Sequence, residues 1–416
     1  QAIDQYGNVH TTKTSVNVRP VTMKDKQEFD WDEARIYFML TDRFYDGDKT
    51  NNNPNGEYYD LDHPESYHGG DFAGITKKLD YLDKLGINTI WITPIVDNID
   101  WDLRYGKEGS QYGYHGYWAK NFEKLDEHLG DMAAFHRLID AANERGIKIM
   151  VDVVLNHPGY GMEPGAVSNG ATNFPTNKER QVFEGMIRSN PVDGDDLKMS
   201  LSGLPDFKTE EAAVRDQLVK WQTDWIKRSK TKKGNTIDYF RVDTVKHVDS
   251  TTWKSFKNEL TAIKPDFKLI GEHYGASVNN TGGYLRSGQM DSLLDFDFKY
   301  QAESFVNGNI DGVESALQYR NKQLSNEATL GQFLSSHDED GFLVSRAGGD
   351  EGKHMVAASL QMTAKGQPVI YYGEEIGQSG KHAGDMDKGE FNENRYDFDW
   401  KRVTGEGKAM HTHYQK

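Results

Sequence analysis

The alternation of short apolar runs with amphipathic helical patterns most constrains the fold of this chain. Eight runs have the length and apolarity of buried parallel strands, and they lie at 36–40, 89–92, 148–154, 239–242, 268–271, 293–296, 331–334 and 368–372. Helical patterns lie between them at 75–85, 135–142 and 214–225, where apolar residues recur on one helix face. Gly86 and Gly146 stand where two of these helices should end. The pattern predicts an α/β fold, a (β/α)8 TIM barrel.

Length, charge and cysteine content narrow the class of protein. The chain has 416 residues, and 65 acidic against 49 basic side chains give a net charge of −16. An acidic balance argues against nucleic-acid binding and against a membrane surface. No apolar run approaches the ~18 residues of a membrane helix, and no signal segment opens the chain. The absence of cysteine excludes disulfides and thiol chemistry but fits both cytosolic and secreted proteins.

Two irregular stretches and the two chain ends define the expected domain organisation. Residues 158–210, rich in Gly, Pro and Asn, separate the third strand from its helix, and a loop of that length predicts an inserted subdomain B. The barrel then comprises 29–157 and 211–416, with a second irregular stretch at 374–400. Residues 1–28 resemble the end of a preceding β domain and a linker, and 409–416 an eighth barrel helix that stops early. We therefore expect a monomeric fragment of a larger multidomain protein.

Carboxylates follow several of the predicted strands. Segments 152–157, 241–247, 272–274 and 336–338 each place an acidic residue at a strand's carboxyl end, where barrels build their active sites. Asp243 and Glu272 are 29 residues apart, about one βαβ unit, so neighbouring strands would hold them roughly 5–5.5 Å apart, as retaining glycosidases require. A single strand-end Asp can simply cap the next helix. Clustered carboxylates with Arg241 two positions before Asp243 favour chemistry instead.

These four segments resemble, in order and spacing, the signature regions of the α-amylase family of glycoside hydrolases (family 13). Segment 203–207, Gly-Leu-Pro-Asp-Phe, resembles a fifth region within the insertion, and 86–95 and 366–374 resemble the sequences around the second and eighth strands. The resemblance covers about residues 30 to 416. Segment 242–247 is most similar to α-amylases and cyclodextrin glucanotransferases, and 29–34 resembles barrel openings in multidomain amylases and pullulanases.

The resemblance implies a set of catalytic roles. Asp243 would be the nucleophile, Glu272 the general acid/base and Asp338 a third carboxylate that binds sugar hydroxyls. The reaction would be a double displacement with retention of configuration. The residue types suit these roles, because the Arg241 cation favours an ionised Asp243 while neighbouring carboxylates and burial favour a protonated Glu272.

The resemblance also implies substrate-binding residues. His157 and His337 would hydrogen-bond the sugar at the cleavage site, while Lys246, His247 and Tyr274 would lie on the leaving-group side. Tyr114 would stack on the sugar, or alternatively pack in the interior. Two residues depart from the family pattern: Ser336 stands where Asn is usual, and His273 where Trp is more familiar. They leave the subfamily open.

Oxygen-bearing side chains cluster in segment 46–52. It is not an EF-hand, because position six is Asn51 rather than Gly and no Glu closes the loop. Hard oxygen donors at this density suit Ca²⁺, although a hydrogen-bonded turn is the alternative. Calcium-binding family members pair such a segment with a later Gly-Gly-Asp, found here at 69–71. The expected ligands of this first site are Asp46, Asp48, Asn51, Asn52, the Gly69 carbonyl and Asp71. A second site would use Asn156, Asp206 and the His247 carbonyl.

The sequence thus predicts a hydrolase that cleaves internal α-1,4 bonds of starch-like α-glucans or maltooligosaccharides. Two alternatives within the family are a cyclodextrin-forming glucan transferase and a pullulan-hydrolysing enzyme. A non-catalytic binding subunit is a remote alternative, because all three carboxylates are present. We expect secretion or attachment to the cell surface, since polymeric starch cannot enter a cell and millimolar Ca²⁺ is extracellular.

Overall fold

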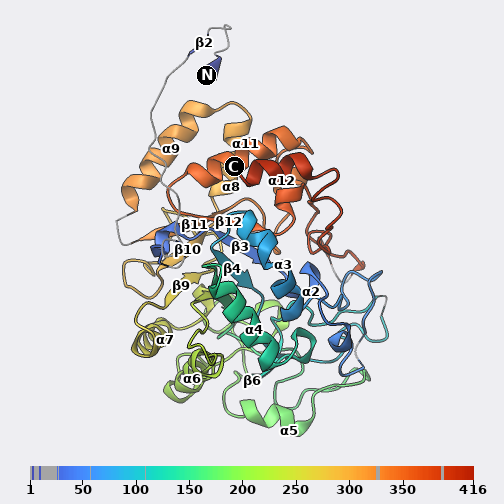
Figure 1. Cartoon of the computed structure of the whole chain (residues 1–416). Helices are drawn as coiled ribbons and strands as arrows, with labels where there is room; N and C mark the ends of the chain where they lie inside the picture. The colour runs from blue at the N-terminus through green and yellow to red at the C-terminus, as the bar shows by residue number, and fades with distance from the viewer. Residues whose placement is uncertain are drawn as a thin grey trace.

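A closed barrel of eight parallel strands forms the centre of the molecule (Figure 1). The computed structural model describes residues 2–3, 9–10, 26, 28–56, 58–107, 109–324, 328–385 and 388–416. The barrel strands are β3 (Ile36–Met39), β4 (Thr89–Ile92), β7 (Lys148–Val153), β8 (Tyr239–Val242), β9 (Lys268–Gly271), β10 (Ser292–Asp295), β11 (Thr329–Phe333) and β12 (Gln367–Tyr371). Each of the eight predicted runs is confirmed as a barrel strand.

The barrel closes where its last strand pairs with its first. Val369 of β12 lies opposite Ile36 of β3 in a parallel register. Every residue of β3, β4, β8, β10, β11 and β12 is buried, because side chains fill the barrel on one face and helices cover the other.

Helices surround the strands in Figure 1. The longer ones are α3 (Phe72–Lys84), α4 (Met132–Asn143), α6 (Ala212–Arg228), α7 (Ser250–Ile263), α8 (Phe298–Val306), α9 (Ile310–Gln323), α11 (Glu351–Thr363) and α12 (Lys408–Tyr414). The apolar stripes predicted for α3, α4 and α6 face the core. Gly86 and Gly146 have φ of +85° and +70°, which confirms them as left-handed residues just beyond α3 and α4.

Short helices occupy the loops. They are α2 (Thr41–Phe44), α5 (Asn177–Arg180), α10 (Phe342–Ser345) and the 3-10 turns η1 (Trp31–Glu33), η2 (Lys49–Asn51), η3 (Glu127–Leu129), η4 (Gln181–Phe183), η5 (Leu201–Gly203), η6 (Val245–His247) and η7 (Glu374–Ile376). Within 158–210 the described structure is a set of such turns, with one bridge between Ile187 and Phe207. The chain therefore carries an insertion after the third barrel strand, β7.

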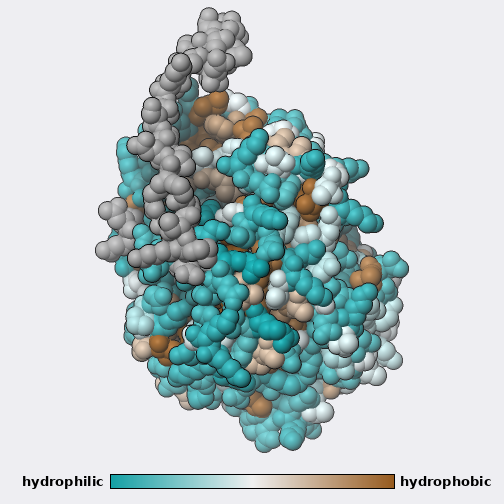
Figure 2. Space-filling model, viewed as in Figure 1, coloured by the Kyte–Doolittle hydropathy of each residue, from teal (hydrophilic) through white to brown (hydrophobic). Residues whose placement is uncertain are grey.

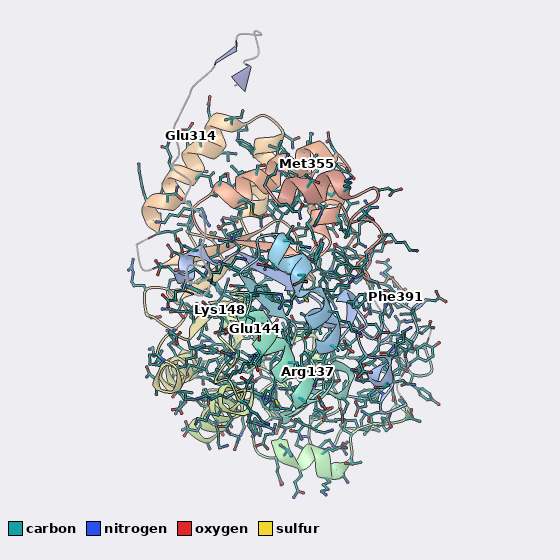
Figure 3. The ribbon with its side chains drawn as sticks, in the orientation of Figure 1. Arg137, Glu144, Lys148, Glu314, Met355 and Phe391 are labelled. Atoms are coloured by element: carbon teal, nitrogen blue, oxygen red, sulfur yellow. The ribbon has the colours of Figure 1, made fainter. Side chains whose placement is uncertain are left out.

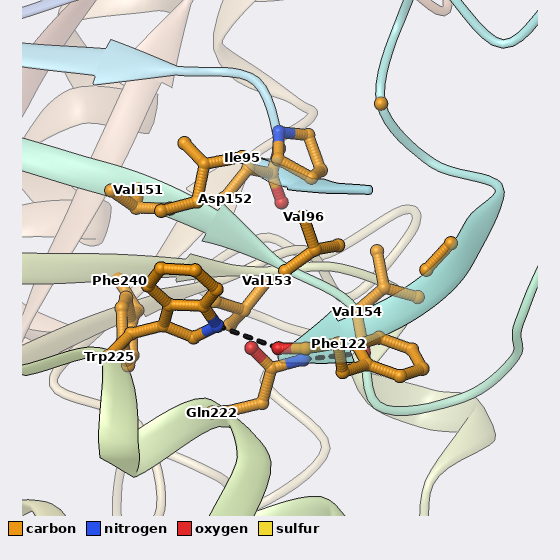
Figure 4. Close-up of a pocket in the computed structure, with 13 residues that line it drawn as sticks. Ile95, Val96, Phe122, Val151, Asp152, Val153, Val154, Gln222, Trp225 and Phe240 are labelled. Atoms are coloured by element: carbon orange, nitrogen blue, oxygen red, sulfur yellow. Dashed lines mark hydrogen bonds between the residues drawn. The ribbon is translucent and has the colours of Figure 1, made fainter. Parts of the chain in front are cut away.

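A small antiparallel sheet outside the barrel was not predicted. Strands β5 (Val96–Asn98) and β6 (Ala119–Leu125) pair between β4 and β7. Helix α6 holds this region against the barrel: Trp225 Nε1 donates to the Phe122 carbonyl at 2.9 Å and Gln222 Nε2 to the Val154 carbonyl at 3.0 Å (Figure 4). The sheet escaped notice because β5 is three residues long and its register is irregular.

The ends of the chain and its surface complete the description. Strands β1 (Ala2–Ile3) and β2 (Val9–His10) form an antiparallel pair; most of the predicted segment 1–28 lies outside the described residues. The face in Figure 2 is largely hydrophilic, with separate hydrophobic patches. None of the helices in the described ranges has the length and apolarity needed to cross a membrane.

Candidate active site

Strand register brings four charged residues to the carboxyl end of the barrel. Asp152 of β7 lies opposite Arg241 of β8. Val242 lies opposite Gly271 of β9, so the next residue on each strand, Asp243 and Glu272, also lie side by side. The sequence prediction that these two carboxylates share neighbouring strand ends is confirmed.

The guanidinium of Arg241 contacts three carboxyl groups. Its Nη1 donates to Asp243 Oδ1 at 2.8 Å and to Asp152 Oδ1 at 3.0 Å, and its Nη2 lies 3.6 Å from Glu272 Oε2. The Arg241 side chain is 1% exposed. A guanidinium is always charged, and burying it is tolerable only because paired carboxylates surround it. This cation binds Asp243 directly, beside a second acidic group.

Glu272 lies farther from this cation than Asp243 does. Burial raises its pKa to about 8, with the charges of Asp243 and Asp338 adding to burial and Arg241 opposing it. Glu272 Oε2 accepts a hydrogen bond from the Thr244 amide at 2.7 Å. Thr244 has a φ of +49°, a strained conformation for a β-branched residue. Glu272 therefore holds a proton at neutral pH while Asp243 next to it is paired with a cation.

Asp338 comes from the turn after β11. Its side chain is 45% exposed to the pocket but closely surrounded by protein. The surrounding protein desolvates the carboxylate, which raises its pKa. The charges of His337 and Arg395 have a larger, opposite effect and lower the pKa to about 2. Arg395 Nη2 donates to Asp338 Oδ1 at 3.1 Å. Burial lowers the pKa of His337 to about 3, so Arg395 is the permanent cation beside Asp338 at neutral pH.

Arg241, Glu272 and Asp338 line a pocket at the carboxyl end of the barrel. Its walls include Arg241, Glu272, Tyr274, His337, Asp338 and the rings of Phe38, Trp91, Phe296 and Phe333. Tyr274 is 56% exposed, and its ring packs 5.0 Å from that of Phe296. The pocket thus combines ionised and protonated carboxyl groups with apolar ring surfaces, which suits a sugar with its hydroxyls and apolar faces.

Three other predicted binding residues follow the barrel strands β7 and β8. His157 is 3% exposed, with Nδ1 3.2 Å from the Asn156 amide nitrogen. Lys246 Nζ lies 3.9 Å from the Asp196 carboxylate, and His247 Nδ1 lies 2.8 Å from the Asp196 carbonyl oxygen. The insertion therefore contacts the barrel through Asp196 at these two residues.

Two tyrosines of one motif occupy different environments. Tyr114, the residue expected to stack on sugar, is 4% exposed, and the Arg43 guanidinium lies 3.9 Å from its ring centre. Tyr117 is only partly buried. Its hydroxyl donates to Asp152 at 2.7 Å, and its ring stacks 5.3 Å from that of His337. Stacking by Tyr114 stays a prediction; the structure adds Tyr117 as a candidate.

Sequence reasoning also missed Arg395 and Trp91. Trp91 Nε1 donates to Asp152 Oδ2 at 3.1 Å, and it sits inside a predicted strand where only packing was expected. Arg395 lies in the irregular stretch after β12, which has no periodicity. The repeated Tyr in Tyr-His-Gly-Tyr-Trp was the available signal for Tyr117.

Three of the residues expected to bind the first Ca²⁺ have an unpaired side-chain oxygen. Asp46 Oδ1, Asn51 Oδ1 and Asn52 Oδ1 are buried without a hydrogen-bond partner. Gly69 packs against the Asn52 side chain, since a Cβ built on Gly69 would lie 2.7 Å from Asn52 Oδ1. Unpaired buried oxygens are costly without a donor or a cation, so these residues fit a hard cation.

The other two expected ligands are already engaged. Asp48 Oδ1 accepts from the Thr50 amide at 3.0 Å. Asp71 caps α3, and its oxygens accept from the amides of Gly74, Asp48 and Gly47 at 2.6, 2.9 and 3.1 Å. The Asp71 carboxylate therefore fixes the loop by binding the backbone amides of Gly47 and Asp48.

The second expected site has fewer free oxygens. Asn156 Oδ1 and Asp206 Oδ1 are buried without a partner, while Asp206 Oδ2 accepts from Arg188 Nε at 2.8 Å. Within the described ranges, no three His, Cys, Asp or Glu side chains gather as metal ligands. Each site would therefore combine one unpaired Asp oxygen with Asn and backbone oxygens.

Comparison with known proteins decides the family. The profile described as "Alpha amylase, catalytic domain" matches residues 38–413. The chain belongs to the α-amylase family. Its members supply the resemblance seen in the signature segments, and the closed barrel is their fold.

Several relatives in the α-amylase family are similar along most of the chain. A periplasmic α-amylase of Escherichia coli is 31% identical over 93% of this chain, and a cyclomaltodextrin glucanotransferase of Thermoanaerobacterium thermosulfurigenes is 31% identical over 82%. The match spans 66% and 49% of those proteins. A solved Anoxybacillus α-amylase superposes with a TM-score of 0.74 at 28% identity, covering 93% of this chain and 79% of that one.

Proposed function

We propose that this chain is a retaining glycoside hydrolase that cleaves internal α-1,4 bonds of starch-like α-glucans. The observation that carries the proposal is the pairing of a protonated Glu272 with an Arg241-bound Asp243 on neighbouring strands. Two carboxyl groups in opposite states are what a double displacement needs.

In the first step Asp243 attacks the anomeric carbon as Glu272 gives its proton to the departing glycosidic oxygen. The bond to that oxygen breaks, and a covalent glycosyl ester forms at Asp243. In the second step the ionised Glu272 takes a proton from water, and the water oxygen displaces Asp243 from the anomeric carbon. Two inversions give net retention, and Glu272 ends protonated again.

Three further residues support this chemistry. Ionised Asp338 can accept hydrogen bonds from two sugar hydroxyls. Neutral His337 can donate one more from its ring. The partly exposed ring of Tyr117, parallel to His337, offers a surface for the apolar face of the sugar at the cleavage site.

A second candidate function is glucan transfer, in which a sugar hydroxyl replaces water in the second step. The exposed ring of Tyr274 at the pocket mouth favours it, because an aromatic surface there can hold an acceptor sugar. Relatives named cyclomaltodextrin glucanotransferase and neopullulanase keep transfer and pullulan hydrolysis open.

A product profile tests the proposal. The chain is incubated with soluble starch, amylose and pullulan, and the products are separated by length. Short linear maltooligosaccharides from starch and amylose support the hydrolase. Cyclic or lengthened products indicate the transferase, and trisaccharides from pullulan the pullulan-active enzyme. Inactivity of the folded protein on all three would leave only a binding role.

The nucleophile is tested by substitution. Asp243→Asn keeps the side-chain shape but removes the charge, so turnover should fall by a factor of ~10³ or more. Circular dichroism should show an unchanged fold. An Asn variant with full activity would refute the role of Asp243.

We also propose that the protein binds Ca²⁺ through Asp46, Asn51, Asn52 and the Gly69 carbonyl, and acts outside the cell. A bound ion would neutralise Asp46 and satisfy the unpaired oxygens. Ca²⁺ at 100 times its Kd would add ~2.7 kcal/mol to the free energy of unfolding, about 3 °C for a chain of this size. Calorimetry with and without a chelator measures this. A melting temperature that chelation leaves unchanged would contradict the site.

A further inference from the structure

The segment that follows Phe391 (right edge of Figure 3) lies against the turn that carries Asp338. Its Asn394 is completely buried. Asn394 Nδ2 donates to the Ser336 carbonyl at 2.8 Å and to the Glu339 carbonyl at 2.7 Å. One side-chain amide therefore binds both ends of the four-residue turn 336–339.

Two neighbours of Asn394 hold the middle of the same turn. Asn392 Nδ2 and Arg395 Nε both donate to the His337 carbonyl, at 3.3 and 3.0 Å. Arg395 also binds the Asp338 carboxylate. Three side chains of one short segment thus contact three carbonyls and the carboxylate of a single turn.

Asn394 is itself fixed by partners outside the turn. Its carbonyl accepts from the Tyr371 hydroxyl at 2.7 Å. Its Oδ1 accepts from the Gly380 amide at 3.2 Å. These contacts orient the amide so that its two N–H groups face the turn. A carboxylate of the same shape would have no donor for either carbonyl.

Asp338 depends on this support more than its neighbours do. The side chains of Asp243 and Glu272 are 11% and 12% exposed, at the tips of paired strands, whereas that of Asp338 is 45% exposed on a turn. Side-chain burial therefore restrains Asp338 less than it restrains the other two carboxyl groups. Its position follows from the turn backbone and from the contacts of its carboxylate with Arg395 and His337.

We propose that Asn394 is a positioning residue that fixes the turn 336–339 and thereby the distance of the Asp338 carboxylate from Glu272. The inference rests on the proposed glycosidase function. Asn394 touches neither substrate nor reacting atoms. It acts through Asp338, which binds sugar hydroxyls and whose charge lies near Glu272.

The test compares Asn394→Ala and Asn394→Asp with a matched control, Asn88→Ala. Asn88 is also buried (4% exposed). Its Nδ2 donates to the Glu33 carbonyl at 3.1 Å, and its Oδ1 accepts from the Arg35 amide at 2.6 Å. It lies just before β4, at the opposite end of the barrel from the site. Asn394→Ala and Asn88→Ala therefore each remove a buried side-chain amide, but only Asn394→Ala removes hydrogen bonds to the turn 336–339.

We expect Asn394→Ala to lower kcat on a soluble maltooligosaccharide about 10- to 100-fold, because displacing a reacting-site group by ~1 Å has that effect, with KM changed less than threefold. The alkaline limb of kcat/KM should also move to lower pH. Asp243 and Asp338 raise the pKa of Glu272 against Arg241, so moving Asp338 away lowers it. Asn88→Ala should lower the melting temperature but leave kcat and the alkaline limb of kcat/KM unchanged.

The outcomes separate the two proposals. If the wild type is active and Asn394→Ala keeps its kcat and alkaline limb, or if Asn88→Ala shifts both equally, the positioning role is wrong. If the wild type cleaves no α-glucan, the proposed function falls and this inference with it. Should both Asn394 variants fail to fold, Asn392→Ala removes one bond to the turn, and a kcat loss with the same limb shift would support the role. An unchanged limb would overturn it.

Discussion

At the scale of single residues, this site is governed by how one cation is shared. Arg241 binds Asp152 and Asp243 directly and lies farther from Glu272. Burial raises the pKa of Glu272 to about 8 and that of Asp152 to about 7, although the Arg241 charge opposes both shifts. Arg395 repeats the arrangement for Asp338. Two arginines thus stand beside three neighbouring carboxyl groups, of which Asp338 has a lowered pKa and Glu272 a raised one.

The raised pKa of Glu272 predicts how activity depends on pH. Glu272 must be protonated to act as an acid, and its pKa is raised to about 8. Hence kcat/KM should be constant through neutral pH and fall tenfold per pH unit above about 8. Asp338→Asn removes a charge that raises this pKa, so its remaining activity should decline at lower pH. Initial rates from pH 5 to 10 measure both, and a wild-type decline beginning near pH 5 would contradict the assignment.

At the scale of elements, the sequence predicted the strands that are buried on both faces, because such strands are rich in apolar residues. All eight barrel strands were found because each is a short, mainly apolar run that is buried between a filled barrel and a helix. The sheet β5–β6 was missed because three paired residues leave no alternation. Asp243, Glu272 and Asp338 could be located from strand ends, but Asn394 and Arg395 could not. Asn394 and Arg395 form hydrogen bonds to a turn, and such contacts leave no hydrophobic pattern in the sequence.

The contact between α6 and the small sheet can be tested. Trp225 is buried, and its Nε1 donates to the Phe122 carbonyl of β6. Trp225→Phe leaves that buried carbonyl unpaired and opens a cavity, so the free energy of unfolding should fall by roughly 2–4 kcal/mol. Urea denaturation measures the change. A loss below ~0.5 kcal/mol would show that the hydrogen bond does not tie the sheet to α6.

At the scale of the whole molecule, buried acids and net charge act in the same direction. Burial raises the pKa of Glu374 to about 8 and of Glu375 to about 7, and within the described ranges neither forms an ion pair with a basic side chain. Folded pKa values above the unfolded value of ~4.3 mean that the folded state binds these protons more tightly. The stability they confer below pH ~4 is lost as pH rises toward 8, while the net charge of −16 adds repulsion.

The melting temperature should therefore fall steadily between pH 6 and pH 9. Glu374→Gln cannot ionise, so this variant should show a shallower decline even if it is less stable at pH 6. Differential scanning calorimetry at constant ionic strength compares the two slopes. A wild-type melting temperature that rises over this range would contradict the prediction.

The pairing of β12 with β3 has a consequence for synthesis in the cell. The first barrel strand leaves the ribosome more than 300 residues before the last. At translation rates of 5–20 residues per second, β3 waits on the order of 20–60 s for its final neighbour. During that time one edge of a growing, strongly apolar sheet is open to any other strand. Newly made chains should therefore need either a chaperone or a partial seal by local helices until residue 371 emerges.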